Sequence, residues 1–195
     1  MSTRERILDA AAELLRTRGV AQATTKEIAQ ASAVSEPTLY KYFGDKERLL
    51  LAVLEERLPG LSRVNVRPGE GDVEDNLAAL AHAALEFYQR SIPMLGALLA
   101  DPQRMRAHRE AMSRHGAGPD RPLMAFAAYL RAEQDAGRVA PAAEPEAAAA
   151  LILGACFQEA FLRYYRHGPD APAAPRSFAD SLARSVVRPL LREPE

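Results

Sequence analysis

The 195-residue sequence predicts an all-α protein, and three observations lead to that fold class. Nearly every segment between glycines and prolines repeats apolar residues at the spacing of a helix. Residues 63–66 alternate like a strand, but they are few and lie in a link rich in glycine and proline. No Asn-Gly or Asp-Gly pair provides a tight hairpin turn. We therefore expect about nine or ten helices, arranged as two domains over residues 1–58 and 59–195.

Side chains that cap helices locate the first four helices. In a capping box, two residues three apart each use a side-chain oxygen, one a hydroxyl and one a carboxylate, to accept from the other's backbone amide. Ser2 and Glu5 have that spacing. Thr24 and Glu27 repeat it. We expect Ser2 to cap a first helix that ends at Gly19, and Thr24 to cap a second over 25–31. We expect Ser35 to cap a third over 36–43, and Asp45 to cap a fourth that ends at Leu58.

Prolines and glycines divide the rest of the chain. A polar link at residues 59–72 is the natural boundary between the two domains. The later helices are expected at 73–91, 93–100, 102–115, 120–136, 144–166 and 176–192.

Composition limits the class of protein. Hydrophobic residues at 48% and charged residues at 26% exclude wholesale disorder. A formal net charge of −1 argues against a general polyanion binder, although it permits a local nucleic-acid site. Only three of the 25 basic residues are lysines, and Lys26, Lys41 and Lys46 fall in one short segment.

Several absences indicate where the protein works. An amphipathic pattern begins at the N-terminus, so we expect no secretory signal. The apolar run Ala147–Phe157 is shorter than the roughly 20 residues that span a bilayer, and it predicts a buried helix and no membrane. Cys156 cannot form an internal disulfide, which favours a cytoplasmic location. The four histidines lack metal-ligand spacing, so we expect no metal and no cofactor.

The helices at 25–31 and 36–43 have helix-turn-helix proportions. Ile28, Leu39 and Phe43 can face inward and hold the two helices together. Pro37, Thr38 and Lys41 then project outward from the second helix. Such a helix fits the major groove of B-DNA, where base edges can be read.

The run from Thr24 to Leu49, TTKEIAQASAVSEPTLYKYFGDKERL, resembles the DNA-binding motif of tetracycline-repressor (TetR) family regulators. The resemblance is strong over residues 4–58 and is one of architecture beyond them. It implies an N-terminal three-helix helix-turn-helix domain and a C-terminal helical bundle for ligand binding and dimerisation. A transcriptional repressor, and no enzyme, is the implied function.

The resemblance also implies roles for single residues. The side chains that would contact DNA phosphates are Thr25, Tyr40, Tyr42 and Lys46. Those that would read bases are Glu36, Pro37, Thr38 and Lys41. Outside such a motif, the two tyrosines would be a half-buried packing pair, and Glu36 would be a helix-start acid that interacts with the helix dipole.

The sequence departs from the family pattern in two places. The usual Ala-Gly of the turn is Ser32-Ala33 here. Ala33 costs roughly 1 kcal/mol relative to glycine if the turn requires a left-handed residue. Pro37 replaces a frequent glycine, but a missing N–H does little harm in the first turn of a helix. We expect the fold to survive both.

The C-terminal half is implied to pair with a second copy and to bind a small molecule. The same apolar faces would also suit the core of a monomer, so periodicity alone leaves both interpretations open. The expected dimer contacts are Ala148, Ile152, Ala155, Glu159, Phe178, Leu182, Val186 and Leu190. The expected pocket walls are Phe87, Tyr88, Met94, Leu98, Met105, Met112, Phe126, Tyr129, Phe157 and Phe161.

We interpret the sequence as a one-component transcriptional regulator. It is expected to bind a palindromic double-stranded DNA operator as a homodimer and to be released by an unidentified small-molecule effector. The alternative is a DNA-binding regulator with no small ligand, controlled by a protein partner. An enzyme is disfavoured because the sequence has no nucleophile–base pair, metal spacing or phosphate-binding loop.

Overall fold

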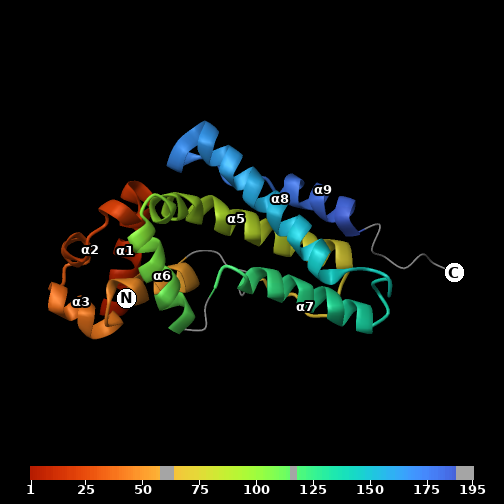
Figure 1. Cartoon of the computed structure of the whole chain (residues 1–195), viewed down its shortest axis with the longest axis horizontal. Helices are drawn as coiled ribbons and strands as arrows, with labels where there is room; N and C mark the ends of the chain where they lie inside the picture. The colour runs from red at the N-terminus through yellow and green to blue at the C-terminus, as the bar shows by residue number, and fades with distance from the viewer. Residues whose placement is uncertain (58–63, 115–117, 188–195) are drawn as a thin grey trace. The chain divides into compact units, whose positions relative to one another are not determined.

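The computed structural model describes residues 1–57, 64–114 and 118–187. Within those ranges it contains nine α-helices, one 3-10 turn and no β-strand, so the predicted all-α class is confirmed (Figure 1). The helices are α1 (Thr3–Gln22), α2 (Thr25–Ala31), α3 (Glu36–Phe43), α4 (Lys46–Glu56), α5 (Val73–Leu99), α6 (Pro102–Arg114), α7 (Arg121–Asp135), α8 (Pro145–His167), the 3-10 turn η2 (Gly168–Asp170) and α9 (Arg176–Val187).

Two predicted helix ends are wrong. The first helix continues through Gly19 to Gln22, because one interior glycine costs a helix only about 1 kcal/mol. The predicted helices at 73–91 and 93–100 are one helix, α5, that continues through Pro93. Ile92, beside the proline, is buried, so packing outweighs the backbone hydrogen bond that proline cannot make.

The chain forms two compact units. Unit 1 consists of Met1–Pro59 and Arg90–Gly118, and unit 2 of Gly60–Gln89 and Pro119–Glu195, so α5 contributes to both. The predicted domain boundary between residues 58 and 59 lies outside the described residues and stays a prediction.

Unit 1 is built on a core shared by α1 to α4. Ile7, Ile28, Leu39 and Leu49 are among its fully buried side chains, as their helical spacing predicts. Outside the core, Arg4 joins α1 to the last residue of α4. It makes two hydrogen bonds to the Glu56 carboxylate, at 2.6 and 2.7 Å. The α6 helix packs on α4.

Unit 2 is centred on α8, which packs along α7 and against α9 (Figure 1). Ala149, Ile152, Cys156 and Ala160 follow one another at helical spacing and are completely buried. Among the described residues, only α8 is long and apolar enough to cross a membrane, judged by length and composition. A core helix of this kind meets the same criterion, and this buried face is that of a core helix.

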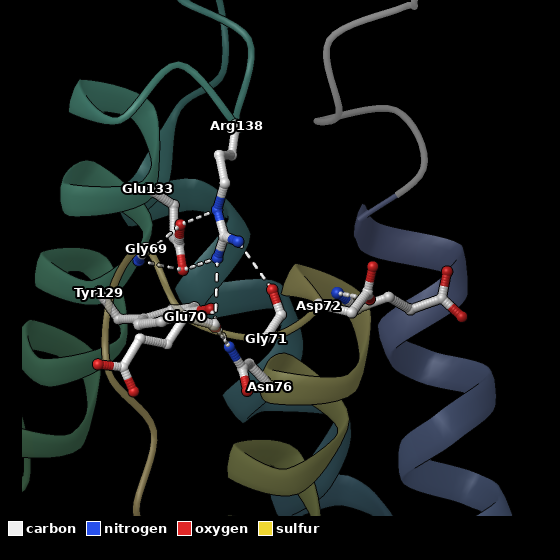
Figure 2. Close-up of polar contacts among 9 residues, drawn as sticks. Gly69, Glu70, Gly71, Asp72, Asn76, Tyr129, Glu133 and Arg138 are labelled. Atoms are coloured by element: carbon white, nitrogen blue, oxygen red, sulfur yellow. Dashed lines mark hydrogen bonds and ion pairs between the residues drawn. The ribbon is translucent and has the colours of Figure 1, made fainter.

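Hydrogen bonds from an ion pair at the end of α7, Glu133 with Arg138, hold the segment before α5 (Figure 2). Glu133 is fully buried, and Arg138 donates to both of its carboxylate oxygens at 2.7 Å. The Gly69 amide also donates to Glu133, while Arg138 donates to the Gly71 carbonyl at 2.7 Å. Burial alone would raise the pKa of Glu133, but hydrogen bonds from Arg138, Tyr129 and the Gly69 amide hold that pKa below its usual value.

We expect Arg138→Ala to lower the free energy of unfolding by about 3 kcal/mol or more, because it leaves the Glu133 carboxylate buried and unpaired. Urea unfolding followed by circular dichroism measures the change. The matched control is Arg131→Ala, which breaks an ion pair with Glu146 whose side chains are 52% and 59% exposed. That control should cost less than about 1 kcal/mol. Equal losses in both variants would contradict the role assigned to Arg138.

Candidate nucleic-acid interface

The first helix of the helix-turn-helix begins at a complete capping box. The Thr24 hydroxyl accepts from the Glu27 amide at 3.2 Å, and the Glu27 carboxylate accepts from the Thr24 amide at 3.0 Å. The predicted box is therefore confirmed. It fixes where α2 starts and so where Thr25, the first residue of α2, lies.

The turn after α2 requires a left-handed residue, and the chain places Ala33 there. Ala33 has a φ of 53°, the only positive φ of a non-glycine residue in the described ranges. Its amide donates to the Gln30 carbonyl at 3.1 Å, and the Val34 amide donates to the Ala29 carbonyl at 2.9 Å. These two bonds form a Schellman motif, which ends a helix and redirects the chain.

The second helix, α3, has one buried face and one exposed face. Ser35 is its N-cap: its hydroxyl accepts from the Thr38 amide at 3.3 Å and lies 2.7 Å from the Thr38 hydroxyl. Leu39 and Phe43 are buried in the core of unit 1. The candidate DNA contacts Pro37, Tyr40, Lys41 and Tyr42 are exposed, whereas Glu36 and Thr38 are half-buried.

Three of the predicted DNA contacts meet in one polar cluster. The Thr25 hydroxyl on α2 lies 2.5 Å from a carboxylate oxygen of Glu36, the first residue of α3. The same hydroxyl lies 3.2 Å from the Tyr40 hydroxyl, one turn further along α3. Spacing rules reach only three or four residues, so they could not predict a contact between residues eleven apart in the chain.

The fourth helix, α4, places the remaining phosphate candidate. Gly44, at a φ of 79°, ends α3, and Asp45 caps α4 by accepting from the Arg48 amide at 2.7 Å. Lys46 is the first residue of α4 and is half-buried. The roles of Lys46 and of the α2–α3 side chains toward DNA stay predictions.

The residues expected at a dimer interface lie in different environments. Ala148 and Ile152 are buried inside the chain itself, so the surface available to a second copy excludes them. Four others line a groove of about 350 Å³ between α8 and α9: Ala155, Glu159, Phe178 and Leu182. The rest of the groove is lined by Gln158, Leu162, Ser181 and Ser185. Val186 is half-buried, and Leu190 lies outside the described residues.

The expected pocket walls lie in both units. In unit 2, the Tyr88 ring makes edge-to-face contacts with Phe87 at 5.7 Å and with Phe157 at 5.5 Å between ring centroids. The other described pocket residues of that unit are Phe126 and Tyr129, which are buried, and Phe161, which stacks on Tyr165 at the surface. Those of unit 1 are the half-buried Leu98, Met105 and Met112, while the Met94 side chain lies outside the described residues.

Cys156 directly precedes Phe157 of this aromatic group, and its thiol is unreactive. Its thiol is buried and donates to the Ala81 carbonyl at 3.4 Å. Burial raises the pKa of the thiol to about 12, so it stays protonated and inert at neutral pH.

Comparison with known proteins gives two family matches that together cover most of the chain. Residues 7–53 match the family described as bacterial regulatory proteins, tetR family. Residues 75–193 match the C-terminal domain of AefR-like transcriptional repressors.

Individual relatives agree with the family matches. The chain is 37% identical over 84 residues to the uncharacterized HTH-type transcriptional regulator YvkB of Bacillus subtilis, a match that spans 43% of this chain and 44% of that protein. It is 27% identical over 187 residues to the HTH-type transcriptional regulator BetI of Agrobacterium fabrum, covering 93% and 88% of the two chains. The solved structure of NalD from Pseudomonas aeruginosa, a secondary repressor of the MexAB-OprM multidrug efflux pump, superposes with a TM-score of 0.62 at 26% identity, covering 98% of each chain.

We expect Ala33→Gly to raise the free energy of unfolding by about 1 kcal/mol, because glycine adopts the left-handed conformation without a steric penalty. Ala33 is exposed, so its methyl group contributes little packing. Ala10→Gly in the interior of α1 is the matched control and should lower stability by about 1 kcal/mol. Thermal and urea unfolding of both variants measure the changes. A loss of stability in both would show that the turn does not favour glycine.

Proposed function

Because the chain belongs to the TetR family of bacterial regulatory proteins, and so is a DNA-binding transcription regulator, we propose that it represses transcription as a homodimer on a palindromic operator. A small-molecule effector bound in the C-terminal half would release it from the DNA. These functions place it in the cytoplasm, where bacterial DNA is found.

The observation that supports the DNA-binding role most directly is the two-sided character of α3. Leu39 and Phe43 anchor the helix in the core, while Lys41 and the tyrosines beside it stay exposed. A short, firmly anchored helix with exposed polar side chains suits insertion into the major groove. In this proposal Lys41 donates to a guanine and Lys46 contacts a phosphate.

Exposed apolar side chains on α8 support the homodimer. Leu151, Phe161 and Tyr165 are 65%, 48% and 79% exposed and recur at helical spacing with the exposed Gly154. Exposed apolar residues grouped on one helix face favour association, and a small residue permits close approach of a second helix. A two-fold dimer would present two copies of α3 to the two halves of a palindrome.

The aromatic group formed by Phe87, Tyr88 and Phe157 supports an effector site of apolar character. Release requires that the effector bind one conformation of the dimer better than the other. A ligand that binds without changing operator affinity would count against this mechanism and favour control by a protein partner.

Selection of bound sequences from random duplex DNA should yield a palindromic consensus. On that operator we expect Lys41→Ala to cost about 1–3 kcal/mol of binding free energy in each half-site and to relax the preference at one position there. Lys46→Ala should instead weaken binding to all duplexes and reduce the slope of log K against log salt by about two, one for each protomer. Fluorescence anisotropy over a salt series measures both. Equal loss on operator and scrambled DNA for Lys41→Ala would contradict base reading.

Placing a charge on the α8 surface should separate the dimer. We expect Leu151→Glu to sediment as a monomer and to bind the operator more than about tenfold more weakly, since a paired dimer makes twice the DNA contacts. Met124→Glu is the matched control, because Met124 is 63% exposed on α7 of the same unit. The control should stay dimeric and bind normally. A Leu151→Glu variant that remains a dimer would exclude this face.

A further inference from the structure

The polar cluster between α2 and α3 has a defined direction of hydrogen bonding. An ionised carboxylate only accepts, so the Thr25 hydroxyl must donate its hydrogen to Glu36 across the 2.5 Å contact. The Thr25 oxygen can then only accept from Tyr40, whose hydroxyl lies 3.2 Å away. Both hydroxyl hydrogens therefore point along one chain, from Tyr40 to Thr25 to Glu36.

Those two hydroxyls are the same groups that would donate to DNA phosphates. To reach a phosphate oxygen, Thr25 must turn its hydrogen away from Glu36, which leaves the carboxylate without that donor. The carboxylate would also lie beside a phosphate group of the same charge. Two like charges a few ångströms apart repel each other even in water.

We propose that Glu36 is a positioning residue that holds back the phosphate contacts of Thr25 and Tyr40 and so weakens sequence-independent DNA binding. This inference rests on the proposed DNA-binding function. Glu36 then has a role different from base reading. In the free protein its carboxylate accepts the hydrogen that Thr25 would donate to a phosphate, and Thr25 in turn accepts from Tyr40. Affinity for unrelated DNA is then low, and base contacts must supply the additional binding on the operator.

The decisive variant is Glu36→Gln, which keeps the size of the side chain and an acceptor for Thr25 but removes the charge. We expect it to bind both the selected operator and a scrambled duplex about 3- to 10-fold more tightly at low salt, by the same factor on each. The gain should shrink as salt is raised, because the interaction is electrostatic. Fluorescence anisotropy with both duplexes over a salt series measures it.

Two controls separate the charge of Glu36 from other effects. Glu110→Gln removes one exposed acid from α6 of the same unit and should leave DNA affinity unchanged. In a Thr25→Val background the gain from Glu36→Gln should be smaller, because the hydroxyl that the carboxylate restrains is gone and only the repulsion between the carboxylate and the phosphate is relieved. A gain of the same size in that background would overturn the role of Thr25.

Weaker binding of Glu36→Gln to the operator alone would mean that Glu36 reads a base, and unchanged binding to both duplexes would mean that it acts only at the helix start. Either result overturns the proposal while leaving DNA binding intact. A wild-type protein that binds neither duplex would instead overturn the DNA-binding function itself.

Discussion

The direction of α3 depends on the turn between Ser32 and Val34. Two backbone hydrogen bonds end α2 there, and Ala33 takes the left-handed conformation that they require. From that point Ser35 caps α3, and the helix has little freedom to rotate because Leu39 and Phe43 are buried on one side. The turn and the two anchors together determine which side chains of α3 remain for DNA.

The exposed face that results is not simply basic. Lys41 and the tyrosines lie on the same short helix as Glu36, and the whole chain has a formal net charge of −1. A protein of this balance gains little from long-range attraction to DNA, so a few short contacts must supply its affinity. In the proposed DNA complex, the contact of Thr25 would compete with a bond inside the protein, its hydrogen bond to Glu36.

Local features of the site could be predicted from the sequence, whereas long-range features could not. The capping box at Thr24 and Glu27, the N-caps Ser35 and Asp45, and the buried Leu39 depend on residues within a turn or two of one another. The contact between Thr25 and Glu36, and the hydrogen bond from the Gly69 amide to Glu133 on α7, join distant residues that no periodicity relates. The continuation of α5 through Pro93 was not predictable from local sequence either, because packing overrides the preference of proline for ending a helix.

The α8 helix shows why periodicity could not identify an interaction surface. Its sequence is apolar almost all round, so the spacing that includes Ala148 and Ile152 and the spacing that includes Leu151 and Gly154 describe equally good helix faces. The helices packed against α8, which are α5, α7 and α9, decide between them: the first face is buried in the chain and the second is exposed. A helix that is apolar on both sides but covered on one has apolar surface left for a partner, and for α8 a second copy of the same face is the simplest complement.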